Sequence, residues 1–221
     1  MLLHGLGTGP GGWRPQIEAF GASRAVIAPW LNFDDRFTVG REASRILDGP
    51  ETAGAVDFCG LSLGALVALR IGLDEPGRVR RLAVCAGFAA LPGWLRALQL
   101  ALGGATAVVP SRFLRGQLVA AVPEQGRETA RRETSRLDRR TIRRVFREGR
   151  RFDVRDELAR LTMPVLVLVG EDDRANRRLS RELAEQISGA ELEVIPGAGH
   201  VANLDAPDAF NEALRRFFDA G

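Results

Sequence analysis

Short apolar runs alternate with segments of helical periodicity along most of the chain. The apolar runs predict strands near residues 1–4, 25–28, 55–59, 82–86, 164–169 and 191–195. The segments between them predict helices near residues 13–20, 40–48, 63–73, 177–188 and 207–219. Strands that alternate with helices predict the α/β class, with a mostly parallel sheet and helices on both faces.

The alternation stops between residues 88 and 160. This segment has helical character, and three prolines interrupt it: Pro92, Pro110 and Pro123. Apolar side chains recur in it at spacings of three and four residues, as on one face of a helix: Leu91, Trp94, Leu95, Leu98 and Leu102. Residues 88–160 therefore form a helical segment between two stretches with the alternating pattern, residues 1–87 and 161–221.

The composition is that of an ordinary soluble protein. The 221 residues are 45% hydrophobic and 27% charged, and this length is enough for one domain with a single core. No apolar stretch reaches the ~20 residues that a membrane span needs, and no signal peptide is visible at the start. These features predict a cytoplasmic protein with no membrane partner.

The two cysteines, Cys59 and Cys85, fall in neighbouring predicted strands. In a reducing compartment we expect two buried thiols rather than a disulfide or a metal pair. The sequence has no cysteine–histidine cluster with the spacing of metal ligands and no glycine-rich phosphate loop. We therefore expect neither a metal nor a cofactor.

All 31 cationic side chains are arginines, and they cluster. Between Arg127 and Arg151 lie eleven arginines and four acids, a local balance of +7. A nucleic-acid surface would interleave aromatic side chains, but Phe146 is the only one in this stretch. We favour a solvated helical face and no nucleic-acid partner; the alternative is that the arginines steer anionic substrates.

The clearest chemical signal is Gly60-Leu61-Ser62-Leu63-Gly64, which lies between an apolar run and a helical run. A serine in this strand–turn–helix setting is held on a strained corner with its hydroxyl exposed. The flanking glycines fit, because a side chain at either position would clash where the chain doubles back. Ser62 is therefore a candidate nucleophile.

Two later segments supply the partners that such a serine needs. The predicted strand 164–169 ends in Gly170-Glu171-Asp172-Asp173, and His200 lies on a loop after the predicted strand 191–195. Serine is a weak nucleophile until a base takes its proton, histidine can do so near neutral pH, and a carboxylate fixes the imidazole tautomer. The chain order serine, aspartate, histidine is the order expected for serine hydrolases built on such a sheet.

An oxyanion hole needs two preorganised donors aimed at the developing negative charge. The backbone amide of Leu63, directly after the serine, is one candidate. The turn His4-Gly5-Leu6-Gly7 supplies the other, for which we favour the amide of Leu6. We expect His4 to be a structural hydrogen-bonding residue of this turn rather than the base.

Together these segments resemble the α/β-hydrolase superfamily, in particular its small-capped esterases and enol-lactonases. The resemblance rests on residues 4–7, 60–64, 170–173 and 196–200 and covers about the whole chain. It implies the α/β-hydrolase fold, with the helical segment 88–160 inserted into the core as the cap. In this family the acid typically lies three residues after the strand-ending glycine, which implies Asp173, with Asp172 as the competitor.

The chain departs from the family pattern in two places. The usual N-terminal strand hairpin is missing, which leaves a sheet edge at which a homodimer contact is an option. The loop after residues 25–28 also lacks the usual glycine-rich turn. Its aromatic side chains, Trp30 and Phe33, are candidates for lining the substrate pocket together with Trp94, although such side chains more often simply pack.

The residues and the resemblance together predict a serine hydrolase that cleaves an ester, a lactone or a related acyl bond of a small molecule. The predicted residues are Ser62, His200 and Asp173 as the triad and Leu6 and Leu63 as the oxyanion hole. The alternative is a non-catalytic ligand-binding or degenerate protein on the same fold.

Overall fold

The computed structural model describes residues 1–97 and 111–220 of the chain. Within these ranges it contains one five-stranded sheet in the order β1-β2-β3-β4-β5, and every neighbouring pair is parallel. The strands are β1 (Leu2–Leu3), β2 (Val56–Leu61), β3 (Val79–Cys85), β4 (Val165–Gly170) and β5 (Glu191–Ile195). The predicted α/β class and parallel sheet are confirmed.

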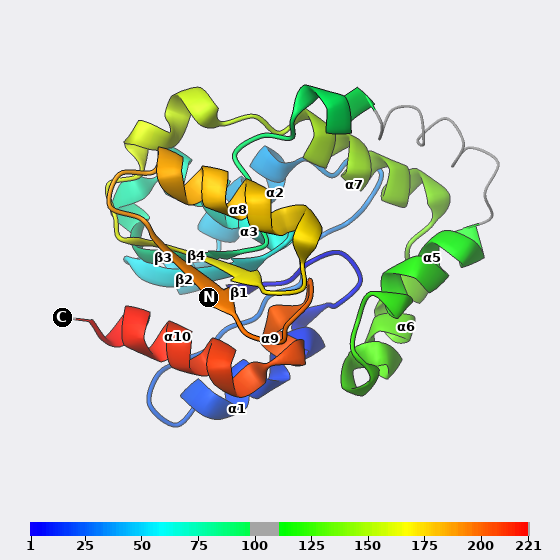
Figure 1. The fold of residues 1–221 in the computed structure, drawn as a ribbon, viewed down its shortest axis with the longest axis horizontal. Coiled ribbons are helices and arrows are strands. Elements are labelled where there is room, and N and C mark those ends of the chain that lie inside the picture. The colour runs from blue at the N-terminus through cyan, green and yellow to red at the C-terminus, as the bar shows by residue number, and fades with distance from the viewer. Residues whose placement is uncertain (98–110, 221) are drawn as a thin grey trace.

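Helices cover both faces of this sheet (Figure 1). One face packs against α2 (Val39–Leu47), α3 (Leu63–Asp74) and α8 (Arg174–Gln186). The other face packs against the short helix η1 (Pro10–Trp13), α1 (Arg14–Phe20) and α10 (Pro207–Asp219). Short helices η2 (Pro50–Thr52), η3 (Pro76–Arg78) and α9 (Ala202–Asp205) complete the core.

The strands alternate between these two layers residue by residue, as extended chains must. Phe58 is buried under α3, whereas its neighbour Cys59 is buried in the layer of α1 and α10. Both cysteine thiols are buried and free, as expected. Burial raises the pKa of the Cys59 thiol to about 12, so this thiol is inert at neutral pH.

Two predicted strands differ from the structure. The strand expected over residues 1–4 is reduced to Leu2–Leu3, and residues 25–28 are not a strand. The Leu2 N–H donates to the Ile27 carbonyl at 2.8 Å, on the side of β1 that faces away from β2. Because β1 is only two residues long, it has too few N–H and carbonyl groups on that side to build a ladder with residues 25–28.

Helices α5 and α6 lie at one end of the molecule, on the right in Figure 1, and α7 leads back from them towards the sheet. The helices of residues 88–160 are α5 (Ser111–Ala120), η4 (Glu124–Gly126), α6 (Arg127–Ser135), α7 (Arg139–Arg151) and η5 (Arg155–Arg160), and residues 93–97 are also helical. Leu98 and Leu102 of the predicted apolar stripe lie outside the described residues. We refer to residues 88–160 as the cap. No helix within the described ranges has both the length and the apolarity to cross a membrane.

Candidate active site

Ser62 stands at the corner between β2 and α3. Its φ is +54°, a left-handed value that is rare outside glycine and strained for serine. A Cβ on Gly60 would lie 2.3 Å from the Gly64 carbonyl oxygen, and one on Gly64 would lie 2.1 Å from the Leu3 carbonyl oxygen. Both positions therefore require glycine, because the strand, the helix and β1 approach one another by their backbones.

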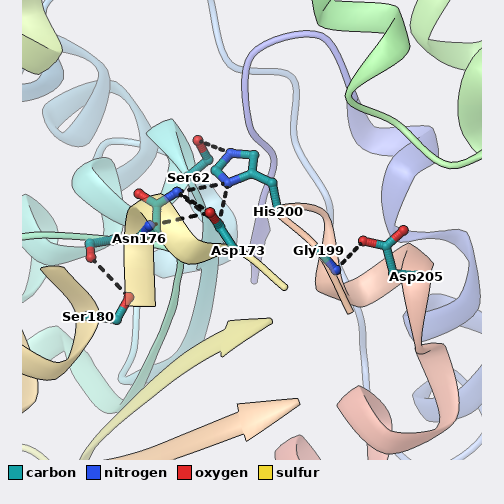
Figure 2. Close-up of polar contacts among 8 residues, drawn as sticks. Ser62, Asp173, Asn176, Ser180, Gly199, His200 and Asp205 are labelled. Atoms are coloured by element: carbon teal, nitrogen blue, oxygen red, sulfur yellow. Dashed lines mark hydrogen bonds and ion pairs between the residues drawn. The ribbon is translucent and has the colours of Figure 1, made fainter. Parts of the chain in front are cut away.

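Three side chains from distant parts of the sequence form a hydrogen-bonded chain at this corner (Figure 2). The His200 Nε2 atom lies 3.0 Å from the Ser62 Oγ atom. The His200 Nδ1 atom lies 2.8 Å from an Asp173 carboxylate oxygen, Oδ2. Ser62 follows β2, Asp173 follows β4 and His200 follows β5, so the carboxyl ends of three parallel strands bring them to one edge of the sheet.

The structure places Asp173, not Asp172, against His200. Asp173 is the N-cap of α8 and is buried, whereas Asp172 is exposed and its N–H donates to the Ala198 carbonyl. Burial alone would raise the pKa of the Asp173 carboxyl. Hydrogen bonds from His200 and Asn176, together with the charge of His200, outweigh burial, so this pKa is lower than its ordinary value.

The loop that carries His200 is fixed through its backbone. The Gly199 N–H donates to an Asp205 carboxylate oxygen at 2.9 Å (Figure 2). A Cβ on Gly170 would lie 2.1 Å from the Gly199 carbonyl oxygen, so the end of β4 and this loop touch by their backbones. These contacts fix the backbone of the loop next to His200 at the edge of the sheet.

The two predicted oxyanion donors both border the cavity at Ser62. Leu63 is the first residue of α3, where backbone N–H groups have no partner within the helix. Within the described parts of the chain, neither the Leu6 N–H nor the Leu63 N–H donates a hydrogen bond to another residue. Both donors thus remain available to a bound oxygen atom.

His4, the first residue of the turn that contains Leu6, is almost fully buried. Its Nδ1 atom lies 2.9 Å from the Gly5 carbonyl oxygen, and its Nε2 atom accepts the Leu31 N–H at 3.0 Å. Burial lowers the pKa of His4 to about 4, so the ring is neutral at neutral pH. These contacts fit the structural role expected of His4 from the sequence.

A cavity of about 420 Å³ opens at Ser62 and His200 between the core and the cap. Its apolar side chains include Leu66 from the core and Phe88, Leu118, Val122, Val145 and Phe146 from the cap. Its polar side chains are Thr8, Ser62, Asn176 and His200. Among the described residues, no arginine, aspartate or glutamate lines this cavity.

The aromatic side chains predicted to bind substrate lie elsewhere. Trp30 and Phe33 line a separate cavity of about 380 Å³ together with His4, against whose ring both pack edge-on. Trp94 is 64% exposed and is not among the residues that line the cavity at Ser62. The aromatic side chains of the loop after residue 28 therefore border a different cavity from the one at Ser62, which the aromatic pattern alone did not show.

The sequence interpretation missed Asn176. Its side-chain nitrogen donates to both Asp173 carboxylate oxygens, at 2.9 and 2.8 Å. The available signal was its spacing, because an aspartate followed three residues later by a polar residue is typical of a helix start. The helix expected from residue 177 in fact begins at Arg174.

Among the described residues, no three histidine, cysteine, aspartate or glutamate side chains converge as metal ligands would. The arrangement can do acid–base and nucleophilic chemistry instead. A hydroxyl faces one imidazole nitrogen, a buried carboxylate faces the other, and the residues that carry two unused N–H groups line the same cavity. This set of groups is suited to acyl transfer.

Comparison with known proteins agrees with this arrangement. Residues 1–213 match the model of the alpha/beta hydrolase family. A putative carbamate hydrolase RutD of Azorhizobium caulinodans is 28% identical over 98% of this chain and 89% of its own length. The 3-oxoadipate enol-lactonase 1 of Acinetobacter baylyi is 26% identical over 98% of this chain and 87% of its own length.

A solved structure extends the likeness to three dimensions. The crystal structure of a hydrolase from Pseudomonas aeruginosa PA01 matches with a TM-score of 0.85 and 25% identity, over 99% of this chain and 90% of the other. The named relatives are hydrolases, which supports hydrolase activity here. The chain belongs to the alpha/beta hydrolase family.

Proposed function

We propose that the protein is a serine hydrolase that cleaves an ester, a lactone or a related acyl bond through a covalent acyl-enzyme. The observation that carries this proposal is the chain of contacts from Asp173 through His200 to Ser62. Ser62, at the end of this chain, lines an open cavity. The relatives named for carbamate, enol-lactone and methyl ester substrates support the same class of reaction.

In the first step the Ser62 hydroxyl attacks the substrate carbonyl carbon while His200 Nε2 takes its proton. The Asp173 carboxylate accepts the Nδ1 hydrogen, which keeps Nε2 free as the base and stabilises the imidazolium that forms. His200 then gives the proton to the leaving group, and the ester of Ser62 remains. A water molecule deprotonated by His200 hydrolyses this ester and restores the enzyme.

The backbone amides of Leu6 and Leu63 are proposed to hold the oxyanion of each tetrahedral intermediate. Because neither amide is used within the described structure, both can turn to the substrate without losing a bond. One such donor contributes about 3 kcal/mol to the stability of the transition state.

The cavity favours a substrate with neutral, apolar groups. Burial of each methylene of an acyl chain contributes about 0.8 kcal/mol, whereas a carboxylate buried without a cationic partner is strongly unfavourable. Because the described lining has no arginine, the arginine-rich helices do not act on the substrate by direct pairing. We therefore favour simple esters with medium-length acyl chains over dicarboxylate-derived substrates.

The test is hydrolysis of p-nitrophenyl esters from acetate to decanoate by the wild type and by Ser62→Ala. We expect activity that rises with chain length and a fall in kcat of at least about a thousandfold in Ser62→Ala. Ser23→Ala, which removes a serine hydroxyl on the loop after α1, is the control and should match the wild type. A wild type with no activity on neutral or charged esters, lactones and carbamates would favour the degenerate, ligand-binding alternative.

A further inference from the structure

We propose that Asn176 is a positioning residue of this hydrolase: its side-chain amide holds the Asp173 carboxylate in the orientation that His200 requires. This inference rests on the proposed function, because it assigns a part in the same reaction to a residue that does not touch the reacting atoms.

The contacts of Asn176 converge on the carboxylate (Figure 2). The Asn176 Nδ2 atom lies 2.9 Å from Oδ1 and 2.8 Å from Oδ2 of Asp173. The Asn176 backbone N–H also donates to Oδ1, at 3.3 Å. Within the described residues, Asn176 is the sole donor to Oδ1, whereas Oδ2 is shared between Asn176 and His200.

The start of α8 explains how one residue supplies both donors. Asp173 is the N-cap and Asn176 is the third residue of the helix, and the Asn176 backbone N–H donates both to the Asp173 carbonyl at 3.1 Å and to the Asp173 carboxylate at 3.3 Å. A side chain at this position can also reach back to the cap residue. Here the Asn176 amide reaches the cap carboxylate rather than the cap backbone, so the helix start and the triad acid share one network.

A buried carboxylate needs such donors. Asp173 is 8% exposed, and an ionised carboxylate without partners is unstable in that setting. His200 supplies one hydrogen bond to Oδ2 and the Asn176 backbone N–H supplies a longer one to Oδ1, at 3.3 Å, which alone restrain rotation of the carboxylate about its Cβ–Cγ bond only weakly. The Asn176 amide, which contacts both oxygens, prevents that rotation and keeps Oδ2 directed at the His200 ring.

The Asn176 amide also lies close to the His200 ring. The Asn176 Nδ2 atom lies 3.2 Å from His200 Nδ1. When Nδ1 carries the hydrogen that bonds Asp173, both nitrogens are donors, so they share the carboxylate between them and do not bond each other. A negative charge in place of the amide would therefore stabilise the imidazolium directly.

The experiment compares Asn176→Ala and Asn176→Asp with the wild type. Asn176→Ala keeps the backbone donor and loses the amide, and we expect kcat to fall by about ten- to a hundredfold while KM changes far less. Asn176→Asp keeps the shape and loses both amide hydrogens, so kcat should fall at least as much. Its carboxyl group would face the Asp173 carboxylate at hydrogen-bond distance, so the two groups should titrate as a pair and move the acid limb of the kcat/KM profile by about one pH unit.

Ser180→Ala is the matched control. Ser180 lies on the same helix, is fully buried and donates to the Gly87 carbonyl at 3.4 Å without touching the triad. This variant should lose some thermal stability but keep the wild-type kcat and pH profile. A kcat loss in both Asn176 variants, together with a moved acid limb in Asn176→Asp, would support positioning, because a purely structural role would change neither kcat nor the acid limb.

Two outcomes would overturn the inference, and they are distinguishable from failure of the proposed function. Asn176→Asp with wild-type kcat and an unmoved acid limb would show that shape alone matters. Asn176 variants that match Ser180→Ala in kcat would show that Asp173 needs no second partner. If the wild type itself neither hydrolyses esters nor reacts with a fluorophosphonate at Ser62, the proposed function fails and this inference with it.

Discussion

The core and the cap of this molecule border the same cavity and constrain it by different means. On the core side, each proposed catalytic group is fixed by backbone geometry. Ser62 lies at a strained corner, Asp173 at a helix start, and His200 on a loop whose backbone packs closely against Gly170. On the cap side, the cavity is bounded by apolar side chains such as Leu118 and Phe146. In the proposed function, the reaction thus depends on short-range backbone geometry and the choice of substrate on side-chain packing.

The charge of the cap belongs to its outer surface. The arginine-rich stretch 127–151 forms α6 and α7, and α7 turns Val145 and Phe146 to the cavity. Arg144 instead binds the Phe37 carbonyl at 2.6 Å, which attaches the cap to the core. This arrangement favours the solvated helical face over the steering of anionic substrates.

The largest expected effect is that of replacing Asp173, the proposed acid on the core side. Asp173→Asn should lower kcat by about 10⁴-fold, because the amide favours the wrong histidine tautomer. Asp172→Asn should change kcat by less than about twofold, since Asp172 is exposed and contacts the His200 loop through its backbone. Steady-state kinetics on one neutral ester measures both. The reverse ranking would mean that the neighbouring carboxylate is the acid.

A smaller effect concerns His4, the buried first residue of the turn that carries the proposed oxyanion donor Leu6. The pKa of His4 is about 4 in the folded protein and 6.5 in the unfolded chain. Between pH 6.5 and pH 4, His4 therefore binds a proton in the unfolded chain but stays neutral in the folded protein. The contribution of neutral His4 to the free energy of unfolding is fully present above pH 6.5. It is lost as the pH falls through 4, by about 3 kcal/mol in total. Urea unfolding at several pH values measures this loss.

His4→Gln supplies the comparison for that measurement. The variant cannot titrate at this position, so its free energy of unfolding should depend less on pH between 4 and 6.5 than that of the wild type. Equal pH dependence in the two proteins would show that His4 is not the group that couples protonation to stability.

The smallest effect belongs to the cap. Phe146→Ala should lower kcat/KM for a decanoate ester about tenfold and leave an acetate ester nearly unchanged, because only the long chain reaches the cap side chains. Phe113→Ala is a matched control, since Phe113 is a similarly exposed phenylalanine of the cap that does not line the cavity. A loss that is equal for both esters would place Phe146 outside substrate selection.

The same contrast explains what the sequence could predict. The corner at Ser62 and the strand β5 follow from glycine spacing and apolar runs, which are local signals. His200 follows from its place after a strand, whereas the choice of Asp173 over Asp172 came from the resemblance to the family. These rules do not extend to the aromatic side chains, and Trp30 and Phe33 pack around His4 instead of lining the cavity at Ser62.

The remaining differences have physical causes of the same kind. Residues 25–28 form no strand because the two residues of β1 cannot support a ladder. Asn176 was missed because its importance lies in the direction of its amide, which depends on where Asp173 and His200 meet. Side-chain direction of this kind is set by the tertiary structure and leaves only a weak trace in the sequence.

The most direct test of the central claim is the mass of the protein after reaction with a fluorophosphonate, followed by mapping of the modified peptide. The account predicts one adduct per chain, located on Ser62, which disappears in Ser62→Ala and forms much more slowly in Asp173→Asn. An unmodified wild type, or an adduct on another residue that persists in Ser62→Ala, would contradict it.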